Sequence, residues 1–178
     1  MSAGLSDVFY LRPMDPPLTP AATLEMGRQA DGCFGLHGVA WMQSFLATDG
    51  RRMLCWYRAP DAESARIALR ELGAELRGVW PGRVLGNVEP RDSSLSKVNV
   101  IAELLPAGAI GKEALLDRLH GVTADFAEIA CAFLSNRRDR LVCLLSGDNA
   151  DAIGQALAAD GFGAARAWPC RVVTPPGD

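Results

Sequence analysis

The sequence predicts an α+β fold of two tandem βαββαβ repeats, residues 1–90 and 91–178, packed sheet to sheet as a pseudo-dimeric α+β barrel. Three observations predict it. The stretch 45–85 aligns on 133–173 without a gap after a shift of 88 residues. Apolar runs and helical spacings follow one another in the same order in both halves. One strand of each half is apolar throughout, as is typical of strands covered on both faces.

The internal repeat is carried by identical residues at a fixed offset. The pairs include Phe45 and Phe133, Arg52 and Arg140, Cys55 and Cys143, Leu69 and Leu157, and Gly73 and Gly161. The match closes where Trp80-Pro81-x-Arg83-Val84 recurs as Trp168-Pro169-x-Arg171-Val172. A duplicated unit is therefore expected, joined through the polar segment 89–96.

The first repeat is expected to run strand, helix, strand, strand, helix, strand. Thr19 and Pro20 are typical of an N-cap and a first helical residue, and this helix is expected to end near Ala30, before a glycine-rich stretch. Asp49-Gly50 predicts a hairpin, and Gly73 is placed as the residue that ends the second helix. The predicted strands are 8–11, 39–46, 52–58 and 80–85, and the second helix is 61–72.

The second repeat is expected to follow the same order. Asp148-x-x-Asp151 is interpreted as the capping signal of its second helix, which Gly161 closes. The predicted strands are 98–105, 126–133, 140–145 and 168–173, and the first helix is 111–119. This βαββαβ order is the ferredoxin-like arrangement.

The runs 53–57 and 141–145 are apolar at every position. Helices cover only one face of a ferredoxin-like sheet, so the other face needs a second partner. We expect the sister repeat to supply it, which predicts a cavity between the repeats.

Composition and charge exclude several classes of protein. The chain has 178 residues, 49% hydrophobic, with a net charge of −3 and a pI near 5.4. This acidic balance argues against nucleic-acid binding, and no apolar run is long enough to span a membrane. Five cysteines without a Cys-x-x-Cys spacing predict reduced, buried thiols and a cytoplasmic location. The chain is expected to be a monomer or a homodimer.

Both histidines, His37 and His120, lie in the tetrapeptide Leu-His-Gly-Val. If the two motifs correspond, the imidazoles occupy related loops and converge on the cavity as metal ligands or as a catalytic general base. Cys33, Cys55 and Cys143 are candidates to complete a metal site, with Glu25 as a more distant one. The alternatives are histidines that cap helix ends and cysteines that pack in the core.

Arg83 and Arg171 occupy equivalent strand positions and are candidates to hold a carboxylate or phosphate of a ligand. The alternative is a salt bridge with an acidic residue such as Glu103 or Asp7. Trp41, Trp56 and Tyr57 would suit a planar organic ligand, or they form ordinary core. Because the second repeat lacks these aromatic residues, a site would be built mostly from the first repeat.

A family resemblance rests on one motif in the first repeat. It consists of Val39-x-Trp41-x-x-Ser44-Phe45, Asp49 in the turn, Cys55-x-Tyr57-x-Ala59-Pro60, Glu63, Arg66 and Gly73. The motif resembles the family of small nickel-binding, ferredoxin-like proteins, mostly known as a domain of unknown function. The resemblance implies a ferredoxin-like fold, dimeric association and binding of a divalent metal such as nickel.

The chain departs from this family at one position. The family commonly carries Arg-Glu-His in the second helix, whereas this chain has Arg66-Ile67-Ala68, and Ala156 in the second repeat. The leading functional hypothesis is a small-molecule or divalent-metal binding protein with its site between the repeats. One alternative is a cofactor-independent enzyme of the dimeric α+β barrel type, an isomerase, cyclase or oxygenase with a histidine base. Another is a scaffold or regulatory protein without a site.

Overall fold

The computed structural model describes residues 4–106 and 111–176. Within them the chain forms four α-helices and eight β-strands. Its contacts divide it into two compact units, which we call unit 1 and unit 2. The described part of unit 1 is 4–82 with 171–176, and that of unit 2 is 83–106 with 111–170.

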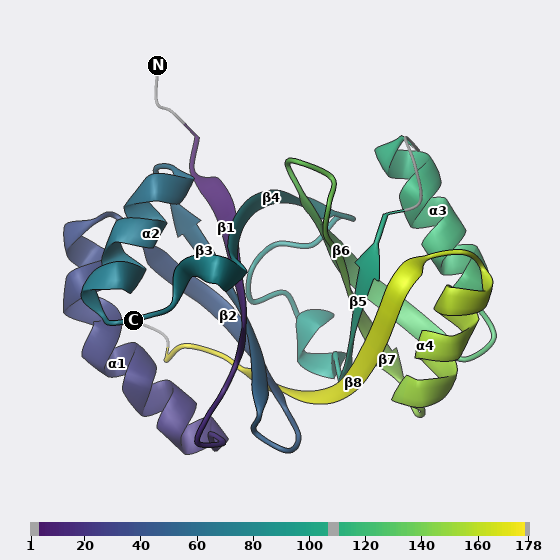
Figure 1. Cartoon of the computed structure of the whole chain (residues 1–178), viewed down its shortest axis with the longest axis horizontal. Coiled ribbons are helices and arrows are strands. Elements are labelled where there is room, and N and C mark those ends of the chain that lie inside the picture. The colour runs from purple at the N-terminus through teal and green to yellow at the C-terminus, as the bar shows by residue number, and fades with distance from the viewer. Residues whose placement is uncertain (1–3, 107–110, 177–178) are drawn as a thin grey trace. The chain divides into compact units, whose positions relative to one another are not determined.

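Unit 1 has the ferredoxin-like strand order β4-β1-β3-β2, with antiparallel neighbours. The helices α1 and α2 lie side by side on one face of this sheet (Figure 1). Its elements are β1 (Ser6–Pro13), α1 (Pro20–Leu36), β2 (Ala40–Ala47), β3 (Arg52–Ala59), α2 (Ala62–Glu71), a 3₁₀ turn (Leu76–Gly78) and β4 (Val79–Leu85), of which 79–82 belong to unit 1.

Unit 2 repeats this topology, with the strand order β8-β5-β7-β6. Its elements are a 3₁₀ turn (Leu95–Lys97), β5 (Val100–Leu105), α3 (Lys112–Thr123), β6 (Ala127–Ser135), β7 (Leu141–Gly147), α4 (Ala150–Ala159) and β8 (Gly163–Val173), of which 163–170 belong to unit 2. The predicted βαββαβ order is therefore confirmed in both halves.

The repeat extends to irregular details of the strands. The pairing of β2 with β3 shifts between Trp41 and Gln43, and that of β6 with β7 shifts between Ile129 and Cys131. These positions are 88 residues apart, so both units carry the same β-bulge. A bulge re-aims the side chains next to it.

One predicted helix start agrees with the structure and one differs. The Thr19 side chain accepts a hydrogen bond from Ala22 N, with Pro20 as the first helical residue. The cap of α4 is Asn149, whose Oδ1 accepts from Ala152 N at 3.0 Å, and not the predicted Asp148. Asp and Asn cap equally well, so sequence alone does not separate two neighbouring candidates.

The helix α1 is longer than predicted. It continues past Ala30 through Gly32 and Gly35 to Leu36. Phe34, which is only 5% exposed, packs on the sheet from the last part of this helix. Tertiary packing therefore outweighs the low helix propensity of the two glycines.

Replacing Gly32 by alanine should stabilise the protein. Gly32 is exposed within α1, and nothing lies within 4 Å of the position of an added Cβ. Alanine removes the entropic penalty of glycine in a helix, which is worth about 0.5–1 kcal/mol. Urea unfolding should show this gain in the free energy of unfolding. A decrease would contradict a helix that continues through residue 32.

The central strands are covered on both faces, as the apolar runs predict. Met53, Cys55 and Tyr57 face α1 and α2 in the core of unit 1. Leu54 and Trp56 point to the opposite face and are also fully buried. The run 141–145 of β7 is equally buried, at 2% exposure or less.

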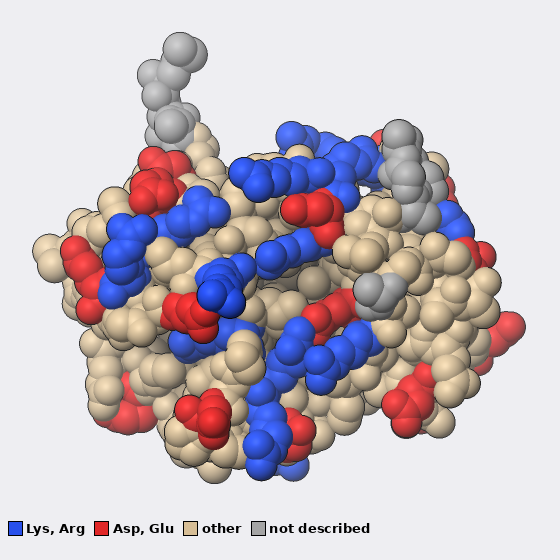
Figure 2. Space-filling view, in the orientation of Figure 1, with Lys and Arg blue, Asp and Glu red and all other residues tan. Residues whose placement is uncertain are grey.

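The charges of the helices in unit 1 are mixed. Acidic and basic side chains lie next to one another at the left of Figure 2, over α1 and α2. Exposed ion pairs such as Arg28–Glu25, at 3.3 Å, contribute little to stability. No helix among the described residues is long and apolar enough to cross a membrane.

Candidate functional site

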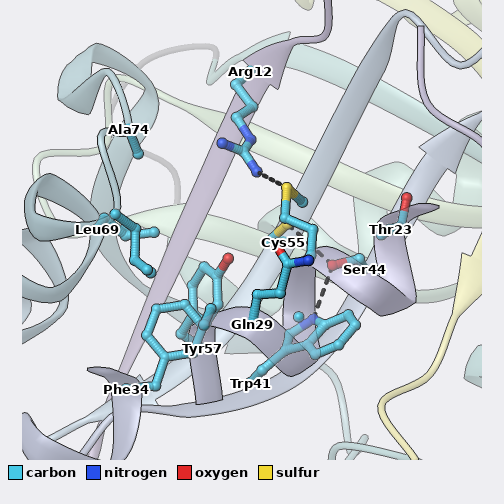
Figure 3. Close-up of a pocket in the computed structure, with 14 residues that line it drawn as sticks. Arg12, Thr23, Gln29, Phe34, Trp41, Ser44, Cys55, Tyr57, Leu69 and Ala74 are labelled. Carbon is cyan, nitrogen blue, oxygen red and sulfur yellow. Dashed lines mark hydrogen bonds between the residues drawn. The ribbon is translucent and has the colours of Figure 1, made fainter. Parts of the chain in front are cut away.

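A pocket opens in unit 1 between the two helices and the side of the sheet that faces them (Figure 3). Its cavity volume is about 160 Å³. The lining residues come from β1, α1, β2, β3 and the end of α2: Arg12, Thr23, Met26, Gly27, Gln29, Ala30, Phe34, Trp41, Ser44, Cys55, Tyr57, Leu69, Leu72 and Ala74. The walls are mainly apolar and aromatic, with a few polar groups among them, as in typical ligand sites.

Strand register places the polar residues in this pocket. Tyr10 lies opposite Cys55, and Arg12 lies opposite Met53. Side chains alternate along a strand, so Arg12 and Cys55 point to the helix side of the sheet. The bulge in β2 brings Trp41 to the same side as Ser44, three residues further on.

The Trp41 indole occupies space that only a glycine leaves free. A Cβ added at Gly27 of α1 would lie 2.0 Å from the Trp41 ring. The ring is held by a hydrogen bond from its Nε1 to Ser44 Oγ at 2.9 Å, and Ser44 Oγ donates to Cys55 Sγ at 3.0 Å. Three neighbouring pocket residues are therefore fixed by one short chain of contacts.

Among the residues that the structure describes, Arg12 is the only cation that lines the pocket. Its Nη2 lies 3.4 Å from Met26 Sδ, and its guanidinium stacks 4.7 Å from the centre of the Tyr10 ring. Its Nε is buried without a hydrogen-bond partner. No acidic side chain among the described residues lies within ion-pair distance of Arg12.

The other titratable groups of the pocket keep their protons at neutral pH. Burial raises the pKa of the Cys55 thiol above its ordinary value of 9.0. Burial also raises the pKa of Tyr57 well above 10.0. Arginine remains charged in proteins. The pocket therefore carries one positive charge and no ionised acid to balance it.

The same face of unit 2 is apolar. Arg12 lies opposite Met53 in unit 1, and Leu104 lies opposite Leu141 in unit 2. Since residues 53 and 141 are equivalent by the offset of 88, Leu104 takes the place of Arg12. By the offset of 88, the other equivalents are Ile129 for Trp41, Ala132 for Ser44, Leu145 for Tyr57 and Cys143 for Cys55. All five residues of unit 2 are buried in its core. A polar pocket lining is therefore a feature of unit 1.

Three of the residues predicted for a site line this pocket, namely Trp41, Cys55 and Tyr57. Trp56 points to the other face of the sheet, where its Nε1 donates to Asp7 Oδ1 at 2.8 Å. Asp7 also pairs with Arg58, at 3.2 Å. Arg83 and Arg171 are exposed on β4 and β8, and neither lines the pocket.

Cys143 is fully buried on β7 in the core of unit 2, where burial raises its pKa. The five cysteines are free thiols, and Cys33 alone is only half-buried. The expectation of reduced, buried cysteines therefore holds for four of the five residues.

The two histidines occupy different kinds of position. His37 is the C-cap of α1, and Gly38 ends that helix with a φ of 64°. His120 lies within α3, which continues through Gly121 to Thr123, and its side chain is exposed in unit 2. The shared tetrapeptide therefore ends a helix in unit 1 and lies within a helix in unit 2.

His37 lies in a cluster that sequence reasoning identified only in part. Its Nε2 is 2.9 Å from Glu71 Oε2, and Cys33 Sγ is 3.4 Å from the same oxygen.

Neither Arg12 of the pocket nor Glu71 of this cluster was predicted from the sequence as a candidate site residue. The alternation of Tyr10 and Arg12 on one strand face is the signal that would have found the arginine.

No protein-family model matches the sequence, and no curated protein matches it. Among solved structures, a "putative monooxygenase" from Lactobacillus acidophilus NCFM superposes with a TM-score of 0.50 at 9% identity over 95% of each chain. An anthrone oxidase-like protein gives 0.49 at 12% identity, covering 97% of this chain and 92% of its own. A mutant chlorite dismutase from Candidatus Nitrospira defluvii gives 0.46 at 12% identity, covering 96% and 92%. The similarity is one of fold.

Proposed function

We propose that the pocket of unit 1 binds a small organic carboxylate, which Arg12 holds through its guanidinium. The comparison of the two repeats carries this proposal. Unit 2 fills the equivalent positions with Leu104, Ile129, Ala132 and Leu145, and this face then forms ordinary core. The fold therefore does not require an arginine or a cavity at this place. A half-buried cation without an acidic partner is instead suited to an anionic ligand.

The size and lining of the pocket define the ligand class. A cavity of about 150 Å³ accommodates benzene in another, engineered protein, and this pocket measures about 160 Å³. Phe34, Trp41 and Tyr57 supply aromatic walls, and the guanidinium fork matches a carboxylate with two parallel hydrogen bonds. A planar acid of the size of benzoate satisfies both conditions.

Isothermal titration calorimetry with benzoate and benzamide tests the proposal. The two probes have nearly the same shape, and only benzoate is charged. We expect benzoate to bind with one-to-one stoichiometry and benzamide to bind at least about tenfold more weakly, because charge-assisted hydrogen bonds are about twice as strong as neutral ones. Equal affinities, or no binding of either probe, would contradict a carboxylate site.

The affinity for benzoate should not change between about pH 6 and pH 8. Raised pKa values keep Cys55 and Tyr57 protonated throughout this range. Affinity should fall only toward about pH 4, where a carboxylic acid ligand takes up its own proton. A titration step near neutral pH, seen in the same calorimetric experiment, would show that another group governs binding.

A second candidate is the cofactor-independent enzyme of the dimeric α+β barrel type. The fold similarity to a structure described as a "putative monooxygenase" supports this alternative better than nickel binding, for which the comparisons offer no support. His37 remains its candidate base. The expected result is conversion of an added substrate that stops in a His37→Ala variant, whereas retained activity in that variant would exclude His37 as the base.

Several expectations from the sequence stay predictions. They are membership of the nickel-binding family, face-to-face packing of the repeats, cytoplasmic location, and a monomeric or homodimeric state. If benzoate does not bind and no enzymatic activity is found, a scaffold role without any ligand is favoured.

A further inference from the structure

The C-terminal ends of α1 and α2 bring together three side chains with different donor atoms. Cys33 and His37 are four residues apart, so they lie on the same face of α1 and its cap. Glu71 is the last residue of α2. Their sulfur, nitrogen and oxygen atoms all lie within 4.8 Å of one another.

Two of the three distances between the donor atoms are near those of a tetrahedral metal site, and the third, between Cys33 Sγ and a ring nitrogen of His37, is at most 4.8 Å. Zinc binds cysteine sulfur at about 2.3 Å and histidine nitrogen or carboxylate oxygen at about 2.0–2.2 Å, which holds neighbouring ligands about 3.4–3.6 Å apart. Here His37 Nε2 lies 2.9 Å and Cys33 Sγ 3.4 Å from Glu71 Oε2.

Three protein ligands leave the fourth coordination position of a tetrahedral ion open. The His37 side chain is 24% exposed, so an ion has access to the site from solvent.

The helix ends favour a cation at this place. Both α1 and α2 end here, and the carbonyl groups of a helix C-terminus carry partial negative charge. The last turn of α1 contains no basic residue, whereas the last turn of α2 contains the exposed Arg70. Glu71, the last residue of α2, places a carboxylate oxygen beside both Cys33 and His37.

An activated cysteine nucleophile does not fit the same contacts. The neighbour of Cys33 is a carboxylate and not the imidazole, since both Cys33 and His37 contact Glu71. A nucleophilic cysteine needs a basic or cationic neighbour that favours its thiolate, and a carboxylate does not supply one. A metal ion would instead replace the thiol proton as the partner of the sulfur.

We propose that Cys33, His37 and Glu71 form a binding site for a divalent zinc-type cation, which ties the end of α1 to the end of α2. The mixed sulfur, nitrogen and oxygen set suits a borderline metal such as Zn²⁺. The site contains His37 and Cys33, both of which the sequence offered as candidate ligands, and adds Glu71. It does not depend on the carboxylate pocket.

Cobalt titration of the tag-free, metal-free chain tests this site. Co²⁺ replaces Zn²⁺ in tetrahedral sites and gives visible bands, together with a thiolate charge-transfer band in the near ultraviolet. We expect one equivalent to bind with both features and to be displaced by Zn²⁺. The absence of binding, or binding without the thiolate band, would overturn the proposal.

Matched variants assign the ligands. Cys33→Ser should abolish the thiolate band, and His37→Ala and Glu71→Gln should each weaken Zn²⁺ binding by more than the 10–100-fold typical of a lost outer-shell partner. His120→Ala is the control, because this histidine is exposed in α3 of unit 2. Equal losses in the control, or unchanged affinity in the three ligand variants, would overturn the site.

Thermal unfolding separates lost ligands from lost folding. Bound Zn²⁺ should raise the melting temperature of the wild-type chain, because a ligand that binds only the folded state stabilises it. The three ligand variants should melt near the metal-free wild type and show no such increase. An equal Zn²⁺-dependent increase in Cys33→Ser would contradict thiolate ligation.

Discussion

An Arg12→Leu variant is expected to bind benzoate at least about 100-fold more weakly than the wild-type chain. Two charge-assisted hydrogen bonds to the carboxylate contribute together about 3 kcal/mol or more, and 1.4 kcal/mol corresponds to a factor of ten. Leucine is the residue that unit 2 carries at the equivalent position, Leu104, so the change imitates a sequence that this fold already accommodates. Calorimetric titration measures the difference.

The same variant should remain folded. Removing the guanidinium also removes a buried Nε that has no hydrogen-bond partner, and replacement of buried charge by apolar groups is often neutral or stabilising. Urea unfolding should therefore show an unchanged or higher free energy of unfolding. Arg70→Leu, an exposed position on α2, is the matched control for charge and should keep its affinity for benzoate. A loss of affinity as large in Arg70→Leu would show a general effect of charge and not a specific contact.

A Gly27→Ala variant is expected to lose about 2 kcal/mol of stability and most of its affinity for benzoate. The added Cβ would overlap three atoms of the Trp41 ring, at 2.0, 2.6 and 2.8 Å. Overpacking of this kind costs about 1–3 kcal/mol. If the ring moves away, it also gives up its hydrogen bond to Ser44 and reshapes the wall of the pocket.

Gly32→Ala is the control for this prediction, because it is the same substitution in the same helix without a steric contact. It should gain stability and keep its affinity. Chemical unfolding and benzoate calorimetry on the pair distinguish the clash with Trp41 from a general effect of alanine in α1. Equal stabilities of the two variants would mean that Trp41 does not pack against Gly27.

The internal repeat made the ferredoxin-like order predictable. Matching residues such as Leu69 and Leu157 are buried in both units, and Gly73 and Gly161 both take the positive φ that ends a helix. These residues have the same structural role in both units, so they recur at the same spacing in both repeats. Two local details were harder to predict from the sequence. The end of α1 depends on the packing of Phe34 against the sheet. The start of α4 is ambiguous because Asp148 and Asn149 are equally good caps.

The candidate site was only partly predictable, because it arises where the repeats differ. Trp41 and Tyr57, predicted as aromatic walls of a ligand site, and Cys55, predicted as a metal ligand, all line the pocket. Arg12 was missed because its counterpart, Leu104, is 92 residues away and not 88, and only strand register aligns the two. Glu71 was missed because no local pattern shows that the ends of α1 and α2 meet.

A crystal structure of the chain with saturating benzoate tests the central claim most directly. The account predicts the aromatic ring of the ligand between Phe34 and Trp41 in unit 1, with carboxylate oxygens about 3 Å from the nitrogen atoms of Arg12. Benzoate bound elsewhere, or a pocket of unit 1 that stays empty at saturation, would contradict it.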